Sequence, residues 1–229
     1  DDIIARGKQP VVVGGTGLYL NALLAGHGFA RGDKDGRYRA ELEARWESEG
    51  GDALYAELAR LDPETARVLH PNDRKRILRA LEVYYETGKT MAQHNAETKR
   101  IPPRYDSVRI GLAYEDREQM KRAIDARVDE MVEAGLFDEV RALLASGVPR
   151  DVTALQAIGY KEALVYLDGA STRGEAIDEI KLRSRQYAKR QLTWLRRDTG
   201  IHWYYWKKTR DLAECLAFST EILRQYGVS

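Results

Sequence analysis

The stretch VVVGGTGLYLNALL, residues 11–24, has the pattern of a strand, a glycine turn and a helix. Its three valines predict a short buried strand, and the leucine-rich part after Gly17 predicts a helix. Between them lie Gly14, Gly15, Thr16 and Gly17. Glycines let an anion approach the backbone, a helix start offers free N–H groups, and Thr16 adds a hydroxyl. The stretch therefore predicts a phosphate site, although a tight turn without a ligand has the same pattern.

Composition predicts a soluble globular protein, with 43% apolar and 32% charged residues among 229. No apolar run approaches the roughly 18 residues that span a bilayer, so we expect no membrane partner. The single cysteine, Cys215, excludes an internal disulfide and is expected to be buried. No metal-ligand spacing relates the four histidines, so we expect no protein-ligated transition metal: His27, His70, His94 and His202.

Two further segments, 107–114 and 201–206, have the β-branched and aromatic content of strands. Helical patterns fill 38–87, 117–146, 154–167, 173–199 and 209–226, and the polar segment 91–106 reads as a linker. About ninety residues, mostly helical, separate the first two expected strands. We therefore expect an α/β core formed by residues 1–33 and 106–229, interrupted by an all-helical insertion at 34–105.

The tetrapeptide TGKT, Thr87–Thr90, resembles the end of a P-loop. A P-loop requires glycine at position 83, which is Val83, and a strand before the loop, where this sequence predicts a helix. Gly88 is more simply the glycine that ends a helix. A kinase that uses this segment is therefore disfavoured.

Two basic helices are candidate anion-binding surfaces. In HPNDRKRILRALEV, Asn72 or Asp73 caps a helix with an apolar inner side, and its cations face either solvent or an anionic partner: Lys75, Arg76 and Arg79. Residues 181–197 carry seven basic residues and no acid, together with Tyr187 and Trp194. Cations bind phosphates and aromatic rings stack on bases, so the two helices together favour a nucleic-acid surface.

Five stretches in register resemble the tRNA dimethylallyltransferase family, and they cover essentially the whole chain. They are VVVGGTGLYLNALL, LHPNDRKRILRALEVYYETGK, MVEAGLFDEVRALL, ALQAIGYKEAL and YAKRQLTWLRRDTGIHWY. The resemblance implies a P-loop-NTPase-like, nucleotide-binding α/β core with a parallel sheet, and a helical insertion domain. It also implies transfer of a dimethylallyl group from dimethylallyl diphosphate to N6 of the adenosine 3′ of the tRNA anticodon.

The resemblance further implies Mg²⁺ as cofactor, a cytoplasmic monomer, and a channel into which the target base is flipped. On this resemblance Thr16 and Arg127 are catalytic, and the diphosphate is bound by Gly14, Gly15, Thr16, Gly17 and Arg127. From the residues alone, Arg127 reads equally as a surface arginine in a salt bridge. The residues that match tRNA contacts are Thr16, Arg39, Lys75, Arg76, Ile77, Leu78, Arg79, Gln156, Gly159, Tyr160, Lys161, Lys189, Arg190, Gln191, Trp194 and Arg196.

The family's opening strand, P-loop and general-base aspartate have no counterpart in these residues. We therefore expect the 229 residues to be inactive by themselves, with an unpaired sheet edge and disorder or aggregation near residue 11. Two alternatives stay open. An adenylate isopentenyltransferase would prenylate a free adenine nucleotide, and an RNA-binding remnant would bind RNA without turnover.

Overall fold

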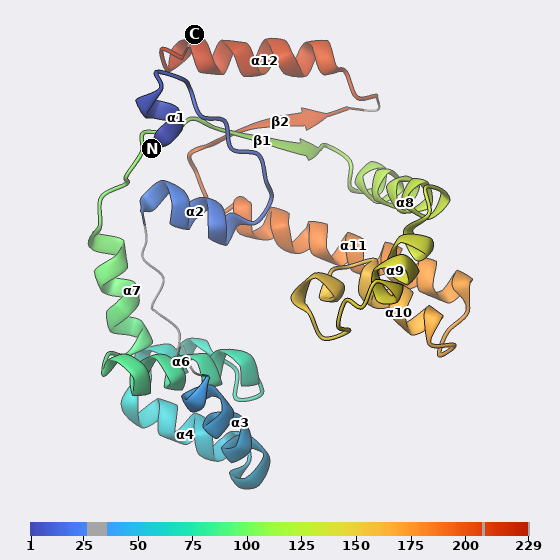
Figure 1. Cartoon of the computed structure of the whole chain (residues 1–229). Coiled ribbons are helices and arrows are strands. Elements are labelled where there is room, and N and C mark those ends of the chain that lie inside the picture. Colours follow the sequence, from blue (N-terminus) through green and yellow to red (C-terminus); the bar gives the residue numbers. More distant parts are fainter. Residues whose placement is uncertain (27–35, 208, 229) are drawn as a thin grey trace. The chain divides into compact units, whose positions relative to one another are not determined.

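The computed structural model describes residues 1–26, 36–207 and 209–228 (Figure 1). Its contacts separate two compact units, one formed by Asp1–Gly17 with Val108–Ser229 and the other by Leu18–Ser107. His27 and the expected domain boundary between residues 33 and 34 lie outside the described residues.

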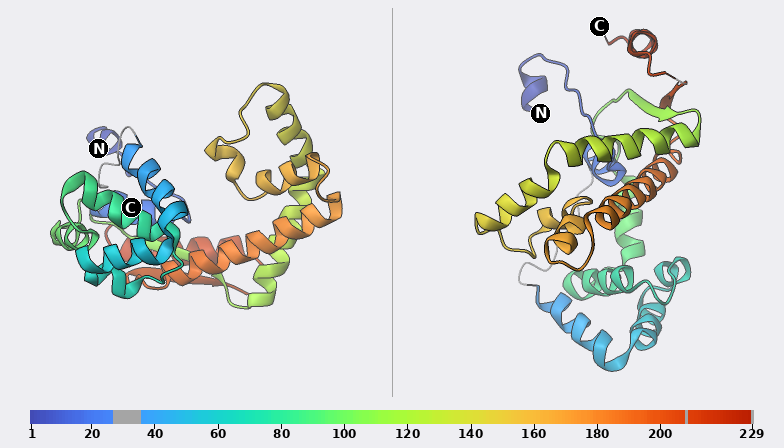
Figure 2. Two further views of the ribbon diagram at one scale, coloured as in Figure 1. Left: turned by 90° about the horizontal axis from the view of Figure 1, so that it is seen from below. Right: turned by 90° about the vertical axis from the view of Figure 1, so that its right-hand side faces the viewer.

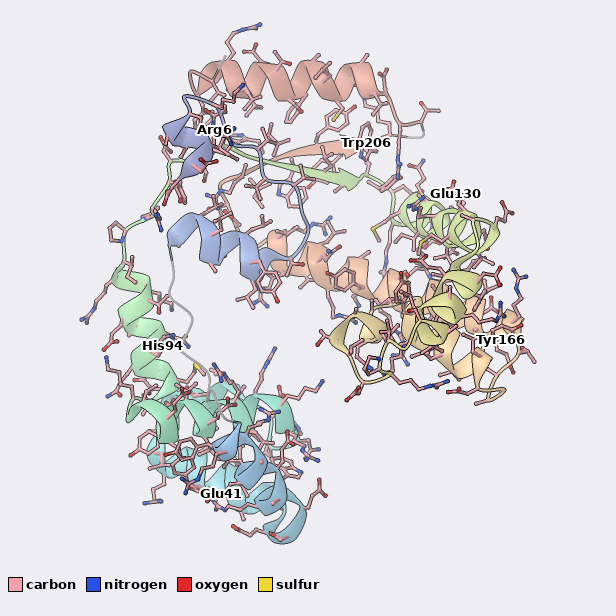
Figure 3. All side chains as sticks on the ribbon, viewed as in Figure 1. Arg6, Glu41, His94, Glu130, Tyr166 and Trp206 are labelled. Atoms are coloured by element: carbon pink, nitrogen blue, oxygen red, sulfur yellow. The ribbon has the colours of Figure 1, made fainter. Side chains whose placement is uncertain are left out.

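The first unit contains a two-stranded parallel sheet, β1 (Arg109–Tyr114) and β2 (Ile201–Trp206). Both strands confirm the predictions made from β-branched and aromatic content. Helix α12 (Leu212–Gln225) covers the sheet face that carries Tyr204 and Trp206 (Figure 3). Cys215 is buried against these two rings, as expected for a small apolar side chain.

The strand predicted at residues 11–13 is wrong. Val11 to Val13 form no strand, and the residues Val11 and Val13 are 82% and 92% exposed. β-Branched residues favour an extended backbone, but a strand also needs a neighbour that satisfies its N–H and C=O groups. Among the described residues no segment pairs with these valines. The valines therefore favour an extended backbone, but no neighbouring strand among the described residues pairs with them.

Helices α8 (Arg117–Glu133) and α11 (Arg173–Leu195) run side by side in the first unit (Figure 2). Arg185 pairs with Asp125 at 2.7 Å and Lys181 with Asp129 at 2.6 Å, so the two helices are antiparallel. Helix α9 (Leu136–Ala145), the short 3-10 helix η1 (Thr153–Gln156) and α10 (Tyr160–Leu167) complete the cluster. The break predicted at Gly135 is confirmed, since this glycine has a φ of +100° that favours glycine.

The second unit is helical. It contains most of α2 (Gly17–Ala25), then α3 (Arg37–Glu49), α4 (Gly51–Leu61), α5 (Pro63–Val68), α6 (Arg74–Thr87) and α7 (Met91–Arg100). Apolar side chains of α3 to α6 form its core: Leu42, Leu54, Leu58, Ala66, Ile77, Leu78, Ala80 and Leu81. Asp73 caps α6 and Gly88 ends it in the left-handed conformation, as predicted. None of the helices within the described ranges is long and apolar enough to cross a bilayer.

The linker predicted at residues 91–106 contains helix α7. A capping box starts this helix, because Thr90 accepts from the backbone of Gln93 and the Gln93 side chain accepts from the backbone of Thr90. Asp62, which is 3% exposed, also accepts a bond of 3.1 Å from the backbone N–H of Ala92. Its other oxygen accepts from the N–H of Thr65 and caps α5. One buried carboxylate therefore holds two helix starts.

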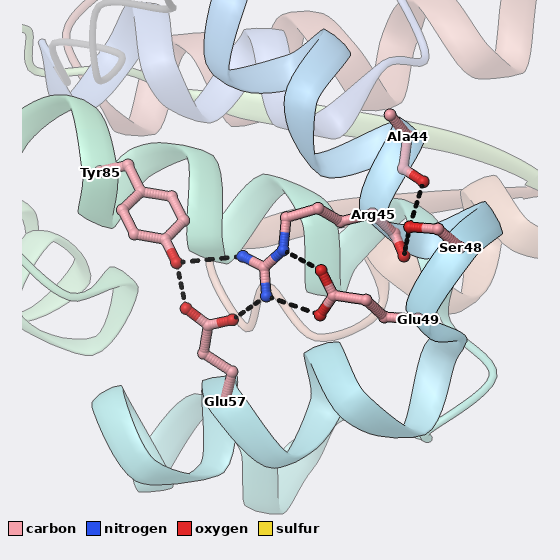
Figure 4. Close-up of polar contacts among 6 residues, drawn as sticks. All are labelled: Ala44, Arg45, Ser48, Glu49, Glu57 and Tyr85. Carbon is pink, nitrogen blue, oxygen red and sulfur yellow. Dashed lines mark hydrogen bonds and ion pairs between the residues drawn. The ribbon is translucent and has the colours of Figure 1, made fainter.

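A polar network ties α3, α4 and α6 together around Arg45 (Figure 4). The guanidinium donates to Glu49 at 2.7 and 3.0 Å, to Glu57 at 2.8 Å and to Tyr85 at 3.4 Å. Tyr85 in turn donates to Glu57. Burial raises the pKa of Tyr85, and its bond to Glu57 acts in the same direction. The network is a structural clamp within the helical unit.

Candidate functional site

The glycine turn is held by two side chains of α11. Nε2 of Gln191 donates to the carbonyl oxygen of Gly15 at 3.1 Å. A Cβ atom on Gly15 would overlap that nitrogen, and a Cβ on Gly17 would overlap the ring of Trp194. The rigid Trp194 ring leaves no room for a side chain at Gly17, whereas a side chain at Gly15 would have to displace the flexible end of Gln191. The glycines have a packing role whether or not an anion binds.

Gly14 and Thr16 are the exposed members of this turn. A Cβ on Gly14 would meet nothing within 4 Å. Within the part of the chain that the structure describes, the Thr16 hydroxyl makes no hydrogen bond. Its backbone neighbours on both sides are fixed while its own side chain faces outward. The turn therefore exposes the Thr16 hydroxyl, while the backbone on both sides of Thr16 is packed against α11.

Arg127 lies on α8 with its side chain 71% exposed, and it pairs with Glu130 at 3.4 Å (Figure 3 labels Glu130). Asp125 and Asp129 point toward α11, as their ion pairs show. Two residues along a helix correspond to about 200° of rotation, so Arg127 points away from α11. Helix α11 therefore does not bring Arg127 and Thr16 together. Their placement around one cavity stays a prediction.

Four candidate cations lie on the first turns of α6 and on α3. Lys75 and Arg76 are exposed, and 73% of the Arg76 side chain is accessible. The Arg76 guanidinium lies 3.5 Å from the carboxylate of Asp73. Arg79 contacts Glu82 at 2.7 Å, and Arg39 of α3 lies 3.5 Å from the other oxygen of the same carboxylate. Glu82 is 7% exposed, so a buried acid sets the position of two half-exposed guanidinium groups. Nothing in the sequence pattern assigned this role to Glu82.

The prediction that Ile77 and Leu78 contact tRNA needs correction. Both side chains are fully buried in the core of the helical unit. They lie on the side of α6 opposite to the exposed cations Lys75 and Arg76, as in an amphipathic helix. Their contribution is to anchor α6, since burial of such a side chain stabilises by about 2 kcal/mol.

The segment Gln156–Lys161 surrounds the start of α10. Gln156 and Lys161 are exposed, and the Tyr160 hydroxyl donates to Glu139, a bond that raises the pKa of Tyr160. Gly159 is buried with a φ of +99°, and its N–H donates to Glu162 at 2.7 Å. Gly159 therefore forms the turn between the exposed residues Gln156 and Lys161. It is itself buried, so it exposes no surface for the direct tRNA contact that was predicted for it.

The basic run on α11 divides into two parts. Lys181 and Arg185 are used in ion pairs with α8, and Arg183 pairs with Glu179. Toward the carboxyl end the cations are exposed, and among the described residues they have no carboxylate partner: Lys189, Arg190, Arg196 and Arg197. Arg190 lies over the Tyr187 ring at 5.9 Å. This end of α11 is the part suited to phosphates.

A shallow pocket of about 460 Å³ lies at the carboxyl end of β1. It is lined by Tyr114, Gln119, Arg122, Ala123 and Arg210, none of which the sequence analysis selected. Arg210 donates to the Tyr114 hydroxyl at 2.6 Å. Neither Thr16 nor Arg127 lines this pocket.

The described residues hold no ready-made cluster of metal-ligating side chains. Over residues 1–26, 36–207 and 209–228, no three His, Cys, Asp or Glu side chains gather as metal ligands. Mg²⁺ prefers carboxylates together with substrate phosphates, and the glycine turn offers only hydroxyl and backbone groups. An Mg²⁺ ion at this turn would therefore depend on the phosphates of a bound diphosphate.

Comparison with known proteins identifies the class. The family model described as IPP transferase matches residues 1–198, and the chain belongs to this family. The tRNA dimethylallyltransferase of Halothermothrix orenii is 45% identical over 202 residues, which are 88% of this chain and 61% of that protein. The tRNA dimethylallyltransferase of Bacillus subtilis is 44% identical over 203 residues, covering 89% of this chain and 64% of that protein.

Two solved structures are similar over 98% of this chain. The tRNA isopentenylpyrophosphate transferase of Bacillus halodurans has a TM-score of 0.59, 41% identity and 70% of its length covered. A eukaryotic dimethylallyltransferase, described as acting on tRNA, has a TM-score of 0.73, 29% identity and 59% coverage. These similarities are consistent with the expected α/β fold with a helical insertion. The chain spans 61% and 64% of the two curated relatives named above.

Proposed function

We propose that this protein transfers a dimethylallyl group from dimethylallyl diphosphate to N6 of the adenosine 3′ of a tRNA anticodon. The observation that carries the proposal is the arrangement at the carboxyl end of α11. Exposed cations suited to an RNA backbone lie on the helix whose Gln191 holds the turn that presents Thr16. The names of the relatives supply the reaction, and this arrangement supports it for the present chain.

In this reaction N6 forms a bond to C1 of the dimethylallyl group while the bond from C1 to the bridging oxygen breaks. The electron pair of the broken bond stays on the diphosphate, and N6 passes a proton to a general base, for which the resemblance finds no counterpart in these residues. The charge that develops on the bridging oxygen needs hydrogen-bond donors and cations. We propose that the Thr16 hydroxyl donates a hydrogen bond to this oxygen and that the Arg127 guanidinium supplies the positive charge. We further propose, from the resemblance alone, that Mg²⁺ is the cofactor and that the protein is a monomer in the cytoplasm.

The RNA surface is proposed in two parts. In the helical unit, the cations of α6 and Arg39 bind phosphates. In the first unit, Lys189, Arg190 and Arg196 do so, and Gln156 and Lys161 lie on a separate exposed segment. Each lost phosphate contact should weaken binding to a similar extent for all RNA sequences. It should also reduce the slope of the logarithm of the binding constant against the logarithm of the salt concentration by about one.

The test compares binding and turnover. An anticodon stem-loop RNA is titrated against the 229-residue chain over a salt series, with AMP as competitor. Transfer from labelled dimethylallyl diphosphate to unmodified tRNA is measured for this chain and for the complete product of its gene. The proposal expects binding that AMP does not compete away, and prenylated N6 from the gene product. The 229 residues alone are expected to bind without turnover.

Other outcomes overturn the proposal in favour of a named alternative. Competition by AMP together with prenylation of free nucleotide would indicate an adenylate isopentenyltransferase. RNA binding with no transfer by either protein would indicate a binding protein. An Arg190→Ala variant that binds RNA as before would remove α11 from the proposed surface.

A further inference from the structure

The geometry points to Gln191 and Trp194 as positioning residues that hold the Thr16 hydroxyl through the backbone of the glycine turn. This inference rests on the proposed function for its chemical meaning, but its structural content is independent of it. It differs from the role that the sequence suggested for both side chains, which was direct contact with tRNA.

The first support is the direction of the two side chains. Gln191 lies eleven residues after Ile180, and eleven residues return a helix to within about 20° of the same face. Ile180 is 1% exposed and forms part of the core on α11. Gln191 therefore continues the inward face of the helix, and its amide reaches Gly15. An inward residue is poorly placed to meet an RNA ligand.

The second support is the closeness of both contacts. The Gln191 amide and the Trp194 ring occupy the space that Cβ atoms on Gly15 and Gly17 would need. Thr16 is the residue between these two contacts. Its backbone is consequently fixed from both sides, while its side chain stays exposed.

The third support is the lack of any other restraint on the preceding segment. Val11 to Val13 form no strand and are exposed. On this side nothing but the α11 contacts defines the turn among the described residues. Loss of those contacts should therefore release Thr16 without unfolding the helices of the first unit.

The experiment uses Gly15→Ala and Gln191→Met. A Cβ on Gly15 would displace the flexible end of Gln191 and break the hydrogen bond that Gln191→Met also removes. Because both changes remove one contact, the double variant should be no worse than either single variant. In the gene product that carries out transfer, misplacement of Thr16 should lower kcat roughly tenfold and leave the KM for tRNA unchanged. The control is Gly174→Ala on α11, whose Cβ meets nothing within 4 Å.

A spectroscopic readout accompanies the kinetics. The backbone amide signals of Gly15, Thr16 and Gly17 are followed by NMR in the 229-residue chain, where both variants should shift them and speed their hydrogen exchange. A higher KM for tRNA with an unchanged kcat, or additive effects of the two changes, would overturn the inference in favour of an RNA contact. Unshifted turn signals would overturn it as well.

The two possible failures are distinguishable. Absence of transfer by the unmodified gene product counts against the proposed function and leaves the NMR comparison to decide whether Gln191 holds the turn. Transfer with unshifted turn signals counts against the positioning role alone. Gln191→Asn, which keeps the amide but shortens its reach, should resemble Gln191→Met if the contact to Gly15 is what matters.

Discussion

Arg79 donates a hydrogen bond from Nη1 to Oε1 of Glu82, 2.7 Å away and one turn further along α6. The second oxygen of this buried carboxylate faces Arg39. Glu82→Gln keeps the shape but removes the charge between two guanidinium groups, so we expect the free energy of unfolding to fall by about 2 kcal/mol. Urea denaturation measures it. Glu43→Gln, which removes the exposed partner of Arg39, should change it by less than about 0.5 kcal/mol.

A second prediction concerns Asp62, whose two oxygens accept from the starts of α5 and α7. In Asp62→Asn one of these acceptors becomes an NH₂ group that faces a backbone N–H. We expect a loss of about 2 kcal/mol and faster hydrogen exchange at Ala92. Asp116→Asn is the control, because Asp116 caps α8 with a single accepted bond that asparagine can replace. Equal effects of the two changes would contradict the double role of Asp62.

A third prediction tests the packing of Trp194 on Gly17. Gly17→Ala places a methyl group inside the indole ring position, and overpacking of this kind costs about 2 kcal/mol. Thermal unfolding of the variant should therefore begin at a lower temperature. Adding Trp194→Ala makes room and should recover part of the loss. A Gly17→Ala protein as stable as the parent would mean that this contact is absent in solution.

A fourth prediction is that replacing Arg127 affects activity but not stability. Among residues 1–26, 36–207 and 209–228 its one ion pair is an exposed one to Glu130, so Arg127→Ala should change stability by less than about 0.5 kcal/mol. If it holds the diphosphate, the KM for dimethylallyl diphosphate, measured in the gene product that carries out transfer, should rise at least tenfold. Arg141→Ala is a matched control, since Arg141 is also exposed and pairs with an acid three residues away. Identical kinetics for the two variants would remove Arg127 from the proposed site.

The pH prediction concerns Tyr204, whose hydroxyl donates to Glu214 at 3.1 Å. Burial, the larger cause, and the hydrogen bond to Glu214 together raise the pKa of Tyr204 from its ordinary value of 10 to about 12. The fold thus favours the neutral phenol. Its contribution to stability is complete below pH 10 and is lost as the pH rises through about 12.

Absorbance of the phenolate groups during an alkaline titration measures this directly. Tyr204→Phe should remove one late-ionising tyrosine and flatten the fall in the free energy of unfolding over this pH range. Tyr205→Phe, which removes the hydroxyl of an exposed tyrosine on the same strand, should leave the late ionisation in place. A titration curve that Tyr204→Phe does not change would show that this phenol is solvated.

Local signals in the sequence predicted most of the elements. Helical periodicity located α3 to α6 and α8 to α11, and the caps Asp73 and Gly88 marked the ends of α6. These predictions succeeded because each depends on residues within a few positions of one another. The strand at residues 11–13 failed because it depends on a neighbouring chain segment, which no local pattern reveals. Helix α7 was missed although its capping box, Thr90 to Gln93, was visible.

The site shows the same division. Cations on exposed helix faces could be selected from the sequence, as Lys75 and Arg190 were. The bond between Gln191 and Gly15 joins residues 176 positions apart, so no spacing rule reveals it. The role of Glu82 likewise depends on α3 packing against α6. The sequence therefore identified which residues carry charge, whereas the structure showed which of them are used to hold others in place.

The pairing of α8 with α11 makes the electric field along α11 uneven. Asp125 and Asp129 neutralise Arg185 and Lys181, whereas the cations from Lys189 onward keep their charge. A polyanion that approaches this helix is therefore drawn toward one end of it, the end from which Gln191 reaches the glycine turn. Capture should consequently weaken in concentrated salt, while the shape of the turn, which depends on a neutral amide and an aromatic ring, should persist.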